Sequence, residues 1–446
     1  MDNDNRYFDM DSIPPQQPAE GVDNKTGSKE KAGGRAGVFI SGMFLGSLVA
    51  LLVSCTVFWV SSVQQKSGSS GKANQDDRKE AVVLSSNKVV NKEFLDKIES
   101  LEAIIESEFY LHEVSDEDLR NGIYKGMLEA LDDAYSEYYT SEELEELLKQ
   151  TSGTYYGIGA YVGLDTETQL PKISGVIKDT PAQAAKLRAN DLIYEVNGES
   201  TYGLSLTEAV ALIKGEEGTQ VVLTILRDGE TLEIPVTRAK VETPTVESKM
   251  LENQIGYIQI LEFDDVTTDQ FAEALAVLKG SDMKGLILDL RANPGGNLDT
   301  VVDIAKMLLP EGLIVYTEDK AGRRAEYKCD GKRRLELPLV VLVDMNSASA
   351  AEILAGAIQD YEIGTLVGTT TFGKGIVQSV MPMKDGSAIK LTVSSYYTPK
   401  GRNIHGTGIE PDILCEFDGE TYYATDGKED NQLDKAVEVM QGMIGE

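Results

Sequence analysis

The chain has 446 residues, of which 41% are hydrophobic and 26% charged, a composition typical of a folded protein with two or three domains. Its net charge is −32, and because phosphate binding needs clustered basic residues, we exclude nucleic acid as a partner. The three cysteines form no Cys-x-x-Cys pair, so no cysteine-built zinc site is predicted.

Residues 1–34 are polar and lack apolar periodicity, which predicts a disordered cytoplasmic tail. Residues 35–63 are predicted to form a transmembrane helix, because no charged residue occurs from Gly37 to Val63 and about 20 apolar residues suffice to cross a bilayer. Four basic residues flank the N-terminal side of this run: Lys25, Lys29, Lys31 and Arg35. Positive charge stays on the cytoplasmic side, so we expect a single-pass protein of the cell membrane that contacts lipid through helix 37–63 and is extracytoplasmic beyond it.

Two alternatives compete with this membrane anchor. A cleaved signal peptide would have a shorter apolar run than this one. It would also end in an Ala-x-Ala cleavage site, and the sequence has no such site. A lipoprotein cleavage box is suggested by 52–55, but the apolar run continues past Cys55.

Residues 64–92 are rich in Ser, Gly and Gln and are predicted to be a flexible linker. In residues 93–150 apolar side chains recur at intervals of three and four, as in Phe94, Ile98 and Leu101, which predicts helices. Residues 151–241 instead alternate short apolar runs with the hairpin signals Asn197-Gly198 and Asp228-Gly229, which indicates a small β-rich module.

Residues 242–446 alternate predicted strands and helices, so the whole chain is assigned to an α+β multidomain class. The predicted pairs are strand Leu286–Leu290 with helix Leu298–Leu309, and strand Leu339–Val343 with helix Ala350–Gln359. A last helix is expected near Asp434–Met443.

The second strand–helix junction contains a candidate nucleophile. Ser349 lies at the start of the predicted helix, where unpaired backbone N–H groups can stabilise an oxyanion. Ser349-x-x-Glu352 is also a capping box, and the local sequence alone favours this purely structural interpretation. The Gly295-Gly296 turn after the first strand is a second candidate source of N–H groups, or simply a tight turn.

Lysine is the remaining candidate for a general base, because neither histidine lies in a Gly-x-Ser-x-Gly motif. Lys374, in Phe372-Gly373-Lys374-Gly375, would need its pKa lowered by burial to act in this way. The same loop is a near-match to a phosphate-binding P-loop. It lacks the Ser or Thr after the lysine, and a β-branched strand rather than a helix follows it.

The β-rich module opens on the turn Gly157-Ile158-Gly159-Ala160. Glycines on both sides of an apolar residue allow several N–H groups to converge on a peptide carboxylate, and the peptide would then add to the sheet as an extra strand. An ordinary glycine-rich turn is the alternative.

Taken in order, these motifs resemble those of the carboxyl-terminal processing proteases, also called tail-specific proteases, over roughly residues 93–415. The resemblance rests on Gly126-Met127-Leu128, Tyr135-Ser136, Gly157-Ile158-Gly159-Ala160, Asp179-Thr180-Pro181-Ala182, Asp289-Leu290-Arg291-x-Asn293-Pro294-Gly295-Gly296, Ser347-Ala348-Ser349-Ala350-Ala351-Glu352, Phe372-Gly373-Lys374-Gly375 and Tyr397-Thr398-Pro399. It implies a PDZ domain over 151–241 and a serine protease domain over 242–446 with a mixed α/β, crotonase-like ββα core.

The resemblance also implies roles for individual residues. Ser349 corresponds to the nucleophile, Lys374 to the base and Gln378 to the residue that orients the lysine. Ala350, Gly295 and Gly296 correspond to the oxyanion hole, with the donating glycine left open. Gly157, Ile158, Gly159 and Ala160 would bind the substrate C-terminus, and Arg188 would couple the PDZ domain to the active site.

We therefore expect a serine endopeptidase that needs no metal or cofactor and acts on proteins with exposed apolar C-termini. A PDZ scaffold with an inactive protease domain and a P-loop enzyme are the rival hypotheses. The physiological substrate, the regulation, a homo-oligomeric state and a disulfide between Cys329 and Cys415 are left open.

Overall fold

The computed structural model describes residues 89–425 and 427–445. The tail, the predicted membrane-spanning run and nearly all of the linker lie outside these residues. Within the described part of the chain, no helix is both long enough and apolar enough to span a bilayer.

The N-terminal region contains the predicted helices and one strand that was not predicted. The helices are α4 (Lys92–Glu108), α5 (Asp116–Glu129) and α6 (Ser141–Thr151). Strand β1 (Glu137–Tyr139) precedes α6 and pairs antiparallel with β18 (Ala388–Tyr397), far along the chain. Its three residues carry no periodic signal of their own, so only this long-range pairing defines the strand.

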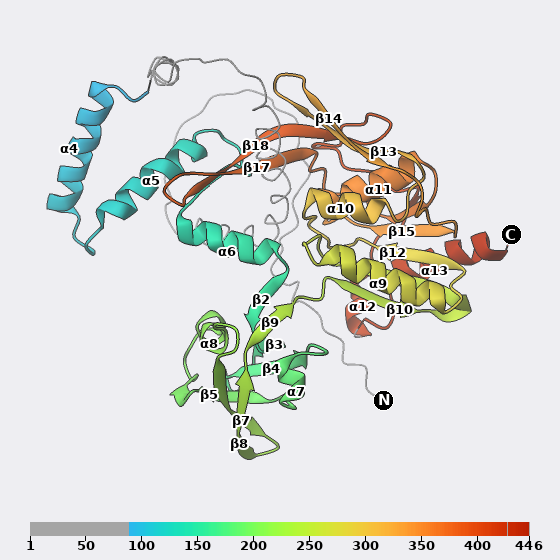
Figure 1. The fold of residues 1–446 in the computed structure, drawn as a ribbon, viewed down its shortest axis with the longest axis horizontal. Coiled ribbons are helices and arrows are strands. Elements are labelled where there is room, and N and C mark those ends of the chain that lie inside the picture. Colours follow the sequence, from blue (N-terminus) through green and yellow to red (C-terminus); the bar gives the residue numbers. More distant parts are fainter. Residues whose placement is uncertain (1–88, 426, 446) are drawn as a thin grey trace, which may run out of the picture.

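The next region is the predicted β-rich module. Its elements are β2 (Thr154–Gly157), β3 (Ala160–Leu164), β4 (Pro171–Val176), α7 (Pro181–Ala184), β5 (Leu192–Val196), β6 (Glu199–Ser200), α8 (Leu206–Ile213), β7 (Gln220–Arg227), β8 (Glu230–Thr237) and β9 (Ala239–Glu242). The main sheet has the order β3-β4-β5-β7-β8, and β2 and β9 form a separate two-stranded ribbon that connects the module to the rest of the chain (Figure 1). Both predicted two-residue hairpin turns are confirmed, with positive φ at Asn197, Gly198, Asp228 and Gly229.

The C-terminal region is built on a six-stranded sheet. Its strands are β10 (Val246–Met250), β11 (Ile255–Ile260), β12 (Gly285–Asp289), β15 (Leu339–Val343), β16 (Thr365–Gly368) and β19 (Ile413–Leu414), in that order. Strands β11 to β19 are parallel, and β10 is an antiparallel edge. Strand β15 has the predicted bounds, whereas helix α10 (Leu298–Ala305) ends four residues before the predicted Leu309.

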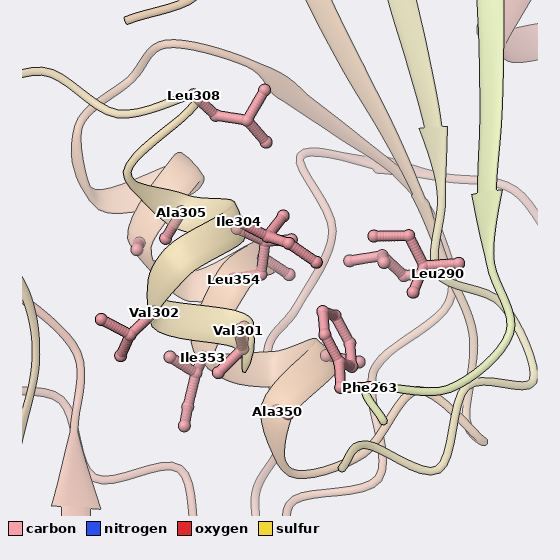
Figure 2. Packing of buried hydrophobic residues seen from close by; sticks show 14 of the residues in the cluster. Phe263, Leu290, Val301, Val302, Ile304, Ala305, Leu308, Ala350, Ile353 and Leu354 are labelled. Atoms are coloured by element: carbon pink, nitrogen blue, oxygen red, sulfur yellow. The ribbon is translucent and has the colours of Figure 1, made fainter. Parts of the chain in front are cut away.

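Helices cover both faces of this sheet. Alternate strand residues explain the arrangement, because Leu286, Leu288 and Val341 face one apolar cluster while Ile287 and Val340 face another. The first cluster includes residues of α9 (Thr267–Gly280), α10 and α11 (Ala350–Asp360), and the second includes residues of α13 (Asn431–Gly445). Figure 2 shows the α10–α11 contact, with Phe263 beside the first turn of α11.

A second sheet packs beside these helices and has the order β1-β18-β13-β14, with β17 (Ile376–Pro382) also paired to β18. Its other strands are β13 (Gly312–Asp319) and β14 (Arg324–Cys329), and the short helices η1 (Glu252–Gln254) and α12 (Gly419–Ala424) complete the fold. Cys329 and Cys415 are both free thiols, one buried and one half-buried.

Candidate active site

The turn between β15 and α11 holds Ser349 in a strained conformation. Its φ of 55° and ψ of −112° are unfavourable for a residue with a Cβ atom, and the side chain is only 1% exposed. The surrounding hydrogen bonds keep this conformation. Tyr396 donates its phenol O–H to the Ser349 carbonyl at 3.1 Å, and the neighbouring Ala348 N–H donates to the Asn293 carbonyl at 2.9 Å.

Glu352, one turn into α11, connects this turn to the lysine loop. Its carboxylate accepts hydrogen bonds from the backbone N–H groups of Ser349 (2.9 Å), Gly373 (2.7 Å) and Lys374 (2.9 Å), and from the hydroxyl of Thr371 (2.6 Å). One of its oxygens accepts from both Ser349 and Lys374, so the two backbones meet around a single atom. We call Glu352 and these four donors the carboxylate clamp.

The carboxylate clamp uses only half of the predicted capping box. The Ser349 N–H donates to Glu352, but in the described part of the chain Ser349 Oγ has no hydrogen-bond partner, neither Lys374 nor any other residue. The hydroxyl is therefore buried and chemically uncommitted.

Ser347, two residues earlier, differs from Ser349 in this respect. Its hydroxyl donates to the Leu290 carbonyl at 2.7 Å, lies 3.1 Å from the carboxylate of Asp344 and accepts the Asp344 N–H at 2.9 Å. Its hydrogen-bonding capacity is used by the turn, so Ser347 is a structural residue.

Lys374 is 5% exposed and lies in the same site as Ser349, but its amine has a different neighbour. Nζ sits over the ring of Tyr135, 4.6 Å from the centroid. Burial, together with the nearby charge of Lys390, lowers the pKa of the Lys374 ammonium to about 8, although the carboxylates of Glu352 and Asp133 oppose this shift. A substantial fraction of the amine is consequently neutral in mildly alkaline solution.

Gln378, on β17, is also buried. Its Nε2 donates to the hydroxyl of Thr392 on β18 at 3.2 Å, across a bulge between the two strands. The residue expected to orient the lysine is therefore bonded to a neighbouring strand.

The two glycines of the predicted oxyanion turn face different neighbours. A Cβ atom on Gly295 would lie 2.7 Å from the Cβ of Ser349, whereas a Cβ on Gly296 would lie 2.3 Å from the carbonyl oxygen of Phe263. The Gly295 N–H donates to Asn293 Oδ1 at 2.8 Å. Ala350 begins α11, so its N–H is one of the first four that have no partner inside the helix.

The predicted peptide-binding turn lies in the β-rich module. Gly159 has a φ of 82°, and the carbonyls of Ile158 and Gly159 accept the N–H groups of Ala182 (2.7 Å) and Ile177 (3.0 Å). Ala160 begins β3, which pairs only with β4 and so leaves one edge of the main sheet unpaired among the described strands. Arg188 is exposed beyond α7, which lies far from α11 in Figure 1.

Two groups at this site were not identified from the sequence. From the sequence, Glu352 is predicted only to be a helix cap, although its spacing of three residues from Ser349 could have indicated a role beside the nucleophile. Tyr135 belongs to the N-terminal region, and nothing local to it indicates a lysine almost 240 residues later.

Comparisons with known proteins identify the family and the domains of the chain. The chain matches the family "Peptidase family S41" over residues 254–415, "PDZ domain" over 172–227 and "Activating protease CtpB N-terminal domain" over 51–143. It therefore has a PDZ domain, and the β-rich module contains the matched residues.

Three curated relatives extend the match. The chain is 38% identical to the carboxy-terminal processing protease CtpA of Bacillus subtilis, over 72% of this chain and 69% of that protein. It is 36% identical to a carboxyl-terminal-processing protease of Synechocystis, over 71% and 76%, and 31% identical to a probable CtpA-like serine protease of Staphylococcus aureus, over 93% and 80%. The chain thus belongs to the carboxy-terminal processing proteases, serine-type peptidases of family S41.

Proposed function

We propose that this chain is a membrane-anchored endopeptidase in which Ser349 is the nucleophile and Lys374 the general base, and in which the PDZ domain captures the C-terminal tail of the substrate. One observation carries the proposal. In residues 89–425 and 427–445, Ser349 is the only buried hydroxyl that lacks a hydrogen bond. Leaving such a group unsatisfied costs about 1–3 kcal/mol, which is reasonable where the group is kept free for a reaction.

The reaction begins with the neutral amine of Lys374. With a pKa of about 8, roughly one amine in ten is neutral at pH 7. The amine removes the Ser349 proton as Oγ attacks the scissile carbonyl. Lys374 then returns this proton to the leaving amine, the peptide bond breaks and an acyl ester on Ser349 remains. Water hydrolyses the ester by the same proton transfers.

The negative oxygen of the tetrahedral intermediate needs donors next to Ser349. We assign this role to the Ala350 N–H and the Gly295-Gly296 turn. The assignment is supported by the position of Ala350 at the start of α11 and by the close approach of Gly295 to the Ser349 side chain. The Gly295 N–H must first leave Asn293 Oδ1 if it is to donate. In the same step Lys374 moves from the Tyr135 ring to Ser349, and Gln378 exchanges Thr392 for the amine.

Tail capture uses the unpaired edge of β3. A substrate C-terminus adds there as an antiparallel strand, with its carboxylate at the Gly157–Ala160 turn. Helix α8 contacts β3 and forms the opposite wall for an apolar last residue. Arg188 would couple tail binding to the active site after the PDZ domain has moved.

Membrane attachment rests on the uncharged run from Gly37 to Val63. It places the tail 1–34 in the cytoplasm and the protease domain outside the cell membrane. Extraction at alkaline pH tests the anchor, because a spanning helix stays with the lipid whereas a peripheral protein is released. Protease treatment of intact cells tests the orientation.

Self-association is proposed on the exposed apolar side chains of the first helix. Helix α4 buries none of its residues, and Leu95, Leu101 and Ile104 are exposed. Sedimentation of the detergent-solubilised chain, with and without a charged residue at Ile104, measures whether these side chains join two copies.

The enzyme assignment is tested with Ser349→Ala and a matched control. The full chain in detergent is incubated with a reporter protein that ends in an apolar tail. Ser349→Ala should lower cleavage by at least about 10⁴-fold and abolish labelling by a fluorophosphonate probe. Ser347→Ala is a control for the loss of a buried hydroxyl from the same turn and should still be labelled.

Persistent cleavage by Ser349→Ala, with unchanged melting, would reject the assignment. If the wild-type chain binds tail peptides but is never labelled, the rival interpretation of an inactive PDZ scaffold is favoured. Comparing protein C-termini in cells with and without Ser349 would then identify the substrates of an active enzyme.

A further inference from the structure

The segment Asp133–Tyr139 belongs to the N-terminal region, yet it is built into the catalytic sheet. Strand β1 pairs with β18 in the register Glu137↔Lys390 to Tyr139↔Ala388. Lys390 Nζ fixes this register by donating to Glu137 Oε2 at 2.8 Å and to the hydroxyl of Tyr139 at 2.7 Å. The segment is therefore attached to the strand that also pairs with β17, which follows the lysine loop.

Tyr135 presents the face of its ring to the lysine. The centroid lies 4.6 Å from Nζ, within the range at which a ring attracts an ammonium group. Tyr135 is half-buried, so water screens this attraction only in part. The ring thus stabilises the protonated lysine in a position where Ser349 Oγ is left without a partner.

Asp133 lies at the start of a hydrogen-bond chain that ends at Gln378. Its carboxylate accepts the hydroxyl of Ser136 at 2.6 Å, and Ser136 Oγ accepts the N–H of Thr392 at 3.1 Å. The Thr392 side chain also faces Asp133, and its hydroxyl accepts Nε2 of Gln378 at 3.2 Å. One segment therefore contacts the lysine directly and reaches its predicted orienting partner through Thr392.

The charges around Lys374 come from several elements. Asp133 in the segment and Glu352 in α11 favour the ammonium, and Lys390 in β18 opposes it. Glu352 already receives four hydrogen bonds, whereas Asp133 receives its bonds from within the segment and from Thr392. Asp133 is consequently the carboxylate whose effect on the lysine depends on how the N-terminal region is docked.

We propose that Asp133 and Tyr135 are positioning residues that hold the Lys374 ammonium away from Ser349, so that docking of the N-terminal segment on β18 sets how readily the amine reaches the nucleophile. The inference rests on the proposed function only for its effect on turnover. The position and protonation of Lys374 can be measured without any activity.

The first experiment measures the protonation of Lys374 directly. The full chain in detergent is labelled with a trace of acetic anhydride at a series of pH values, and acetylation of Lys374 is quantified by mass spectrometry. Asp133→Asn removes a neighbouring negative charge, so the pH of half-maximal labelling should fall by roughly 0.5–1 unit. Asp132→Asn is the matched control: it removes an adjacent, exposed carboxylate and should leave the midpoint unchanged.

The second experiment separates positioning from folding. Tyr135→Leu removes the ring that holds the ammonium away from Ser349. It should raise kcat by about threefold to tenfold with an unchanged KM, and it should shift the pH profile of Ser349 labelling to lower pH. Tyr135→Phe keeps the ring and should restore the wild-type profile. A merely structural role would lower the melting temperature without moving either pH midpoint.

An unchanged Lys374 midpoint in both Asp133→Asn and Tyr135→Leu overturns the inference, whatever the activity. A shifted midpoint in a chain whose Ser349→Ala variant still cleaves substrate would keep the inference about the lysine and reject the proposed function. The two failures are thus distinguishable.

Discussion

Two buried carboxylates lie on either side of the Gly295-Gly296 turn, and they differ in how their charge is satisfied. Glu352 is fully buried and accepts four hydrogen bonds from the carboxylate clamp. Asp264 is 4% exposed and follows Phe263, whose carbonyl abuts Gly296, but one of its oxygens has no partner among the described residues. Burial raises the pKa of both groups.

The surroundings of Asp264 explain why its pKa is raised. The chain passes from α6 into β2 here, and a Cβ on Gly153 would lie 2.9 Å from the Cβ of Asp264. Glu262 and Asp265 are close by, so their negative charges add to the effect of burial and raise the pKa of Asp264 to about 8. This acidic cluster lies where the chain enters the PDZ domain through the β2–β9 ribbon.

Burial alone does not decide what a carboxylate does. Donors aimed at Glu352 make it a fixed connection between the nucleophile turn and the lysine loop. Asp264 is buried among negative charges and has one oxygen without a donor among the described residues, so its charge changes near neutral pH. One carboxylate maintains the geometry of the active site, and the other makes the stability of an adjacent junction sensitive to pH.

The largest expected effect comes from breaking the carboxylate clamp. Glu352→Gln replaces one of the two acceptor oxygens by an NH₂ group. The N–H bonds of one side are therefore lost: those from Ser349 and Lys374, or the one from Gly373. We expect labelling by a fluorophosphonate probe to fall by about 10³-fold and the free energy of unfolding to fall by about 3–5 kcal/mol. Labelling rates and urea denaturation measure the two effects.

Thr371→Val provides the graded comparison for this variant. It removes one of the four donors and should cost about 1–2 kcal/mol of stability. A Glu352→Gln chain that is as stable and as reactive as the Thr371→Val chain would show that the clamp is not a unit.

The sequence could predict the features that depend on local patterns, but not those that depend on long-range packing. Strand β15, helix α11 and both hairpin turns follow from local patterns, and motif order places Ser349, Lys374 and Gln378 in one family-like set. The contribution of β1 and Tyr135 depends on pairing across some 250 residues, for which a local pattern carries no information. The unpartnered oxygen of Asp264 arises from packing between α6, β2 and the Phe263 loop, and such packing has no sequence motif.

The second prediction concerns the turn between the two carboxylates. Gly295 has a φ of 108°, and an added Cβ would lie 2.7 Å from the Cβ of Ser349. Gly295→Ala should displace the nucleophile and lower kcat by about 10²-fold. Melting of this variant is the control, because a variant with normal kcat and a lowered melting temperature would mean that the turn matters for folding alone.

The third prediction tests the other carboxylate. The folded chain holds a proton on Asp264 up to about pH 8, whereas the unfolded chain releases it near the ordinary pKa of 3.8, so this group lowers stability as pH rises between these values. Asp264→Asn cannot ionise and should lose this dependence. From pH 6 to pH 7.5 the wild type should lose about 2 kcal/mol more than the variant in urea denaturation. Parallel curves for the two chains would contradict the role of Asp264.

The smallest expected effect is on kcat/KM, about tenfold for each pH unit. Its sign is opposite to the effect of pH on stability. Lys374 acts as a base only when neutral, so kcat/KM should rise with pH and level off above about pH 8. Stability falls over the same range through Asp264, and Asp264→Asn should flatten the stability curve while leaving the activity midpoint in place. A pH profile of cleavage, measured for both chains below their melting temperatures, separates the two titrations. If the pH midpoint of activity moves in Asp264→Asn, the ionisation of Asp264 affects that of Lys374. The active site is then not independent of the junction to the PDZ domain, despite the carboxylate clamp.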